Sequence, residues 1–118
     1  IINADIHPLQ NLKVTKFLEE EFKLSPEQKQ NWLHKWIGDG LEALERTVSP
    51  LAGNFAIGNA VTAADLFIVP QLFSAARFNV DFSQHKTLVR INENATKLEA
   101  FSKAHPFQQP DTPAEFRK

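Results

Sequence analysis

The chain has 118 residues and a formal net charge of −1, with acidic and basic residues mixed along its length. That length suits a single domain with a hydrophobic core, and the charge pattern shows no basic stripe of the kind that binds nucleic acid. Cysteine is absent, which excludes disulfides, thiolate catalysis and cysteine metal ligands within this chain. No apolar run is long enough to cross a membrane.

The first 24 residues have the spacing of amphipathic helices. Apolar side chains recur every three or four positions, at Ile2, Ile6, Leu9, Leu12, Val14, Phe17, Leu18 and Phe22. Pro8 lies inside this pattern. Because proline lacks a backbone donor and clashes with the preceding turn, we expect a kink or break near Pro8.

A polar stripe runs along the other face of the same segment. Asn3, His7 and Asn11 repeat at every fourth position, with Gln10 beside them. Asn and His are weaker helix formers than Glu or Lys, which a plain solvated face would favour. The stripe suits the lip of a site that hydrogen-bonds a polar ligand, but the residues alone favour the alternative, a kink flanked by ordinary surface amides.

The second helix is predicted to begin at Ser25-Pro26-Glu27-Gln28, which has a capping serine, a proline at the first helical position and glutamine at the capping-box position. Helical spacing continues through Trp32, Leu33, Trp36, Ile37, Leu41, Leu44 and Val48. We expect the helix to end near Ser49-Pro50.

Two glycines, Gly38 and Gly40, lie inside that helix, where each costs about 1 kcal/mol relative to alanine. Close packing of a neighbouring helix would explain them, and so would a local irregularity. The glycine- and asparagine-rich residues 51–60 are predicted to form a loop that carries Phe55 and Ile57 back over the core.

The central helix is predicted to begin with a capping box at Thr62-Ala63-Ala64-Asp65. The Thr62 hydroxyl would accept from the Asp65 N–H, and the Asp65 carboxylate would accept from the Thr62 N–H. Val61 and Leu66 occupy the positions of a hydrophobic staple. The helix would continue through Pro70 to about Arg77, and its nearly all-apolar surface predicts that it is the buried centre of the domain.

The remaining residues predict a helix through Leu88, Ile91, Ala95 and Leu98, then a short helix over 98–104 that ends at His105-Pro106. Pro110-Asp111-Thr112-Pro113 predicts an extended tail. No segment alternates like a strand. The predicted class is all-α, one domain over residues 1–118, with about five to six helices packed around residues 62–77.

Few residues offer chemistry of their own. The four histidines are widely separated and none has a partner at zinc-site spacing, so no metal site is expected. No nucleophile elbow or phosphate-binding glycine loop is present. Asp65 resembles a buried acid, but its capping role accounts for it, so Thr62 and Asp65 are predicted to be structural.

Several segments resemble a known family. Three of them resemble the C-terminal helical domain of cytosolic glutathione transferases, where a T-x-x-D box starts the core helix: Phe55-Ala56-Ile57-Gly58, Val61-Thr62-Ala63-Ala64-Asp65 and Val69-Pro70-Gln71. Four others are more specific to the zeta class: Ile6-His7-Pro8-Leu9-Gln10-Asn11-Leu12, Ala76-Arg77-Phe78 with Asp81, Leu98-Glu99-Ala100-Phe101 and Gln109-Pro110-Asp111-Thr112-Pro113. The resemblance covers nearly the whole chain.

The zeta class includes maleylacetoacetate and maleylpyruvate isomerases. The resemblance therefore implies a glutathione-dependent cis–trans isomerase of a maleyl-type diacid, with glutathione as its cofactor. It also implies that Arg77 holds the acidic substrate and that His7, Asn11, Leu12 and Lys13 contact glutathione. The alternative role for Arg77 is that of a cation completing a helix C-terminus.

In that family a thioredoxin-like domain carries the residues that activate the glutathione thiol. The present chain opens on Ile1 and lacks such a domain, so we expect it to be part of a longer protein and to be inactive alone. The resemblance further implies a cytoplasmic homodimer that acts in aromatic amino acid catabolism, without nucleic-acid or membrane partners. The alternative function is a non-catalytic interaction domain, a role that helical domains of this type also have.

Overall fold

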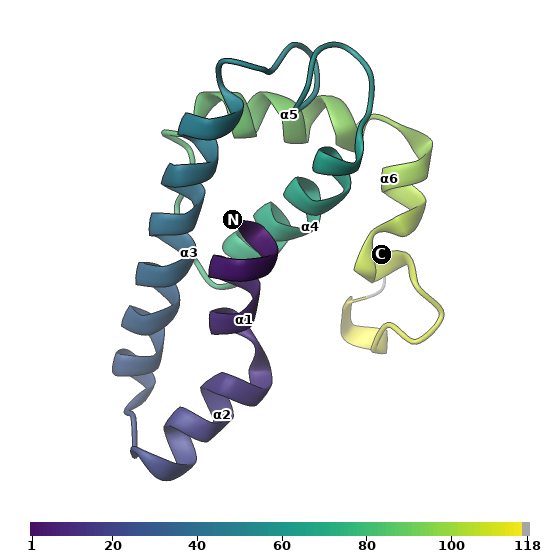
Figure 1. Cartoon of the computed structure of the whole chain (residues 1–118). Helices are drawn as coiled ribbons and strands as arrows, with labels where there is room; N and C mark the ends of the chain where they lie inside the picture. Colours follow the sequence, from purple (N-terminus) through teal and green to yellow (C-terminus); the bar gives the residue numbers. More distant parts are fainter. Residues whose placement is uncertain (117–118) are drawn as a thin grey trace.

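A computed structural model describes residues 1–116, which are mostly helical (Figure 1). Within these residues the only strand-like pairing is an isolated bridge between Ala52 and Gly58, so the all-α prediction is confirmed. The elements in order are the π-helix η1 (Ile2–Ile6), α1 (His7–Gln10), α2 (Leu12–Glu21), α3 (Pro26–Val48), α4 (Ala63–Arg77), α5 (Lys86–Thr96), α6 (Glu99–Ala104), and the 3-10 helices η2 (Pro106–Gln108) and η3 (Ala114–Phe116).

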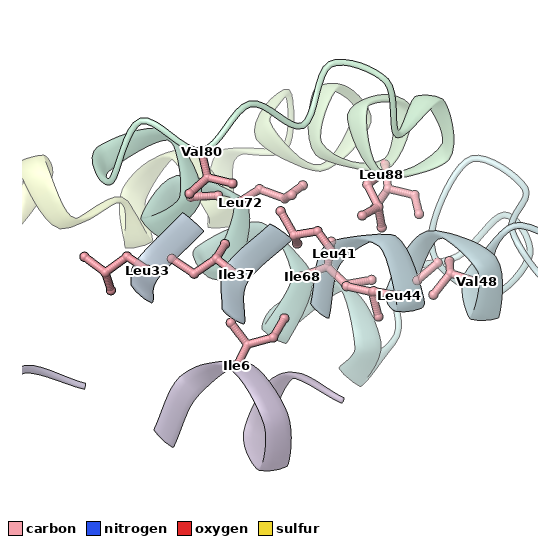
Figure 2. Packing of buried hydrophobic residues seen from close by; sticks show 13 residues of the cluster. Ile6, Leu33, Ile37, Leu41, Leu44, Val48, Ile68, Leu72, Val80 and Leu88 are labelled. Carbon is pink, nitrogen blue, oxygen red and sulfur yellow. The ribbon is translucent and has the colours of Figure 1, made fainter. Parts of the chain in front are cut away.

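The core lies between η1, α3, α4 and α5 (Figure 1). Figure 2 shows the side chain of Ile6 directed from η1 toward Ile37 and Ile68. The largest fully buried apolar side chains come from all four elements: Ile6, Ile37, Leu41, Ile68, Leu72, Leu88 and Ile91. Helix α6 and the C-terminal turns lie on the other side of α4 from α3 (Figure 1).

Helix α3 has the boundaries that its sequence predicted. The Ser25 N–H donates to Gln28 Oε1 at 2.8 Å and the Gln28 N–H donates to Ser25 Oγ at 3.2 Å, which completes a capping box. A Cβ at Gly40 would lie 2.2 Å from Cγ1 of Ile6, whereas one at Gly38 would meet nothing within 4 Å. Close packing is therefore the explanation for Gly40, and the helix is continuous through both glycines.

The N-terminal segment breaks as predicted, although the break follows Pro8 by three residues. Pro8 lies in the first turn of α1, directly after the π-helix, and the helical backbone continues through it to Gln10. The chain then turns extended at Asn11, with φ −60° and ψ 138°. The indole N–H of Trp32 donates to the carbonyl oxygen of Leu9 at 2.8 Å, so α3 supplies a partner for a carbonyl at the break.

The capping box at the start of α4 is confirmed. Asp65 is 0% exposed, and its Oδ2 accepts from the Thr62 N–H at 2.8 Å and from the Thr62 hydroxyl at 3.0 Å. Its Oδ1 accepts from the Ala56 N–H at 2.7 Å. One carboxylate therefore joins the 51–60 loop to the start of the helix. The loop buries Ala56, whereas Ile57 is 53% exposed, so the prediction that Ile57 covers the core is wrong.

Helix α4 is central but is not buried on every side. Its inner face carries Ile68, Leu72 and Ala75, while Leu66 is 57% and Phe67 is 49% exposed. The expectation of burial all round was wrong because the elements packed against α4, mainly α5, η1 and the core face of α3, cover only the side that carries these three residues. An apolar surface therefore remains open on α4.

The C-terminal helices lie where they were predicted, but the tail is not extended. The Thr112 N–H donates to the carbonyl oxygen of Gln109 at 3.1 Å, and the Thr112 hydroxyl donates to that of Pro106 at 2.6 Å. Thr112 is only 5% exposed. These two hydrogen bonds outweigh the preference of residues before proline for an extended backbone. Leu98, predicted to share the face of α5, is the N-cap of α6 and 39% exposed.

Candidate functional site

Two of the cavities that lie against α4 contain predicted site residues, His7 in one and Arg77 in the other. The first has a volume of about 220 Å³ and lies between the N-terminal turns and α4, with polar lining residues Asn3, His7, Gln10, Gln71 and Ser74. The π-helix and α1 therefore place Asn3 and His7 of the predicted polar stripe, together with the adjacent Gln10, on one cavity.

A reciprocal amide pair forms one wall of this cavity. Gln10 Nε2 donates to Gln71 Oε1 at 3.2 Å, and Gln71 Nε2 donates to Gln10 Oε1 at 2.9 Å. The two residues are 9% and 4% exposed. Each amide uses one N–H and one acceptor position in the pair, so each retains a second N–H and further acceptor capacity.

The last members of the predicted glutathione contacts lie beyond the helix break. Asn11 is exposed, and its Oδ1 accepts from the Lys13 N–H at 2.9 Å, which makes Asn11 the N-cap of α2. Its amide N–H groups remain available to a ligand. Leu12 is 62% exposed, as are several other large apolar side chains of the chain.

Arg77 ends α4 and lines the second cavity, whose volume is about 560 Å³. Three phenylalanines, Phe73, Phe107 and Phe116, contribute to its walls, and Asp111 also lies on the lining. The rings of Phe73 and Phe107 pack edge to face, with their centroids 5.5 Å apart. Arg77 is exposed, and its guanidinium has no hydrogen bond or ion pair with the residues that the structure describes.

The end of α4 is closed by the backbone. The Phe78 N–H donates to the Ser74 carbonyl at 3.0 Å and the Val80 N–H to the Ala75 carbonyl at 2.9 Å. Asn79 takes a positive φ of 56°, as is usual just past a helix C-terminus. Since these bonds satisfy carbonyls of the last turn, the guanidinium of Arg77 is not needed as a hydrogen-bonding cap.

Sequence reasoning missed Gln71 and the aromatic residues of the tail. A glutamine between Pro70 and Leu72 in an apolar helix was the available signal, because a buried amide needs a hydrogen-bond partner. Nothing local indicated that Phe107 would line the same cavity as Arg77, since its position depends on the turn at Thr112. No cluster of three potential metal ligands occurs among residues 1–116. None of the helices described has both the length and the hydropathy of a membrane span.

The order of the helices, with a T-x-x-D box at the start of the central one, defines the fold of the C-terminal helical domain of glutathione transferases. No protein-family model matches the chain. Maleylacetoacetate isomerase of Mus musculus is 41% identical over 117 residues, which cover 99% of this chain and 51% of that protein. The zeta-class glutathione S-transferase of Euphorbia esula is 43% identical over 113 residues, or 95% of this chain and 49% of that protein.

A solved structure gives the same result. Maleylacetoacetate isomerase of Anaeromyxobacter dehalogenans 2CP-1, with dicarboxyethyl glutathione and citrate in its active site, matches with a TM-score of 0.90. Its sequence is 39% identical, and the match covers 99% of this chain and 52% of that one. The predicted resemblance to the zeta class is therefore confirmed. The chain spans about half the length of the curated relatives it matches, for example 51% of the Mus musculus protein.

Proposed function

We propose that the protein is a glutathione-dependent cis–trans isomerase of a maleyl-type diacid, in which this domain supplies the acidic-substrate site and part of the glutathione site. The observation that supports this most is the state of Arg77. Its guanidinium is exposed at an aromatic-lined cavity and has no carboxylate partner among residues 1–116. A guanidinium presents paired donors that match the two oxygens of a carboxylate.

The proposed role of Arg77 is to interact with negative charge on the substrate. Glutathione supplies a thiolate that adds reversibly to the conjugated double bond, which permits rotation about the former double bond before the thiolate leaves again. Arg77 would bind a carboxylate of the substrate and stabilise the negative charge that develops on it. The aromatic walls formed by Phe73 and Phe107 would pack against the conjugated carbon chain and exclude water.

The polar residues at the N-terminal turns fit a peptide-like cofactor. Glutathione carries amides and carboxylates, which need both donors and acceptors. His7, with its ring on the smaller cavity, and Asn11, with its free amide N–H groups, would supply them. We propose that Leu12 and the ammonium of Lys13 complete these contacts.

A second domain is part of this proposal. A thioredoxin-like domain would activate the thiol and pack against the open apolar surface of α4, where Leu66 and Phe67 are exposed. We propose that the whole protein is a cytoplasmic homodimer that acts in aromatic amino acid catabolism. The resemblance to the zeta class supports each of these points.

The test is isomerisation of maleylacetoacetate by the protein in which this chain is joined to its thioredoxin-like domain. We expect turnover only when glutathione is present, and none from the 118-residue chain by itself. Binding of glutathione by the joined protein without any isomerisation would contradict the enzyme proposal and favour an interaction domain. Isomerisation by the 118-residue chain alone would show that the second domain is not required.

A further inference from the structure

We propose that the Gln10–Gln71 amide pair is a positioning element that fixes the orientation of His7 relative to α4. This inference rests on the proposed function only in assigning His7 to glutathione. The pair connects residues 61 positions apart in the chain, and both of its hydrogen bonds are buried.

The need for such an element follows from the shape of the N-terminal segment. Helix α1 has only four residues, His7–Gln10, with a π-helix before it and an extended residue, Asn11, after it. A turn inside a long continuous helix is oriented by the helical turns on either side of it. Helix α1 is a single turn between a π-helix and an extended residue, so it lacks this constraint. Its orientation must therefore come from contacts with other elements.

Two directional contacts meet at α1. The Trp32 indole of α3 donates to the Leu9 carbonyl at 2.8 Å, and Gln10 exchanges two hydrogen bonds with Gln71 of α4. Together they join the turn to both long helices. Because His7 and Gln10 are three residues apart on this turn, their side chains lie on one face, and both line the same cavity.

The pair also joins the two halves of the candidate site. Gln71 lies on the same continuous helix as Arg77, which ends that helix. Apolar contacts at this position would bury the same surface, but they are not directional, whereas reciprocal amide bonds fix both distance and rotation. The amide pair therefore holds His7 in register with the helix that carries Arg77.

A positioning role and a purely stabilising role predict different results when these glutamines are replaced with leucine. Replacing Gln71 alone with leucine leaves the buried Gln10 amide without partners and should destabilise the fold. Replacing both residues with leucine removes both polar groups, and such double replacements can be nearly neutral for stability. A purely structural role predicts that the Gln10→Leu/Gln71→Leu protein recovers every property of the original.

The first experiment uses the 118-residue chain and needs no cofactor. Its readout is the NMR signals of the His7 ring in the original chain, in Gln10→Leu/Gln71→Leu, and in a Gln108→Leu control, which changes an exposed glutamine outside both cavities. We expect shifted or multiple His7 signals in the double variant alone, at an unfolding midpoint close to that of the original. Unchanged His7 signals in a folded double variant would overturn the proposal.

The second experiment uses the chain joined to its thioredoxin-like domain. In the double variant we expect the KM for glutathione to rise on the order of tenfold, which is about the effect of losing one good hydrogen bond to the cofactor. An unchanged KM in a protein with altered His7 signals would overturn the link to glutathione. If the original protein has no glutathione affinity, the proposed function fails, and the NMR experiment still decides whether the pair positions His7.

Discussion

The carboxylate of Glu45 on α3 accepts the backbone N–H of Thr87 in the first turn of α5, at 3.0 Å. Its second oxygen accepts the N–H of Leu88, also at 3.0 Å. The N-cap residue of α5, His85, makes no capping bond with its own side chain. The cap of α5 therefore comes from a different helix, and the negative charge lies at the positive end of the α5 dipole.

The first prediction follows from the pKa of Glu45. Burial raises this pKa, but hydrogen bonds from Thr87 and Leu88 outweigh it, and the net direction is below the usual value. A lowered folded-state pKa means that the stabilisation is present above the unfolded-state pKa and is lost as the pH falls through the folded-state pKa. Glu45→Gln should lower the free energy of unfolding by about 1 kcal/mol at pH 7, and by much less near pH 3.

Urea unfolding at a series of pH values measures this difference. Glu42→Gln is the matched control, because Glu42 is on the same helix and its side chain is 61% exposed in an i,i+4 pair with Arg46. Exposed pairs of this kind contribute only about 0.3–0.5 kcal/mol. Equal losses in the two variants at every pH would contradict the assignment of Glu45 as the cap of α5.

The second prediction concerns the carboxylate at the start of α4. Asp65→Ala removes the acceptor for three donors, two on Thr62 and one on Ala56. Of these donors the Ala56 N–H is buried, and a buried donor without a partner costs about 1–3 kcal/mol. The part-buried capping bonds to Thr62 add about 1 kcal/mol, so the total should be about 2–4 kcal/mol. Asp81→Ala is the comparison, because Asp81 is exposed and its carboxylate is hydrogen-bonded only locally, to the N–H and side chain of Ser83 in an exposed turn. Similar denaturation midpoints for the two variants would argue against the role of Asp65.

The starts of α3 and α4 could be predicted because each depends on residues close together in the chain. Ser25 meets Gln28, and Thr62 meets Asp65, across three positions, so the residue types alone indicate the bond. The inner face of α3 was predictable for a similar reason, since its helical period is visible in the sequence.

The errors arose where distant residues decide the outcome. The tail turns because the Thr112 hydroxyl reaches the Pro106 carbonyl, and no local pattern specifies that bond. Leu66 and Phe67 are exposed although the helix around them is apolar, since their burial depends on what packs against α4. In the candidate site, the polar stripe marked His7, but its connection to α4 passes through Gln71, 61 positions from Gln10.

The third prediction separates the two glycines of α3. In Gly40→Ala the new methyl would lie 2.2 Å from Cγ1 of Ile6, which is 0% exposed and must move within the core. Overpacking of this kind costs about 1–3 kcal/mol, which equals or exceeds the gain of about 1 kcal/mol in helix propensity. In Gly38→Ala nothing lies within 4 Å, so that gain should appear in full.

Thermal unfolding of the two alanine variants measures the difference. We expect Gly38→Ala to raise Tm and Gly40→Ala to leave it unchanged or lower it. Adding Ile6→Val to Gly40→Ala should relieve part of the clash, because the valine side chain lacks the terminal methyl that lies 2.6 Å from the new Cβ. Stabilisation of similar size in both single variants would show that η1 does not pack closely on α3.

The last prediction concerns Arg77 in the protein joined to its thioredoxin-like domain. If the guanidinium binds a substrate carboxylate, Arg77→Ala removes a hydrogen bond to a charged group worth about 1.5–3 kcal/mol, and kcat/KM should fall about ten- to a hundredfold. Arg77→Lys should recover only part of this, because an ammonium lacks the two-pronged geometry. Glutathione affinity should stay nearly constant, since His7 lies on the other cavity.

The control substrate is an uncharged electrophile, which has no carboxylate that Arg77 could pair with. Equal slowing of charged and uncharged substrates by Arg77→Ala, at unchanged stability, would mean that Arg77 does not recognise substrate charge and is simply a cation at the end of α4.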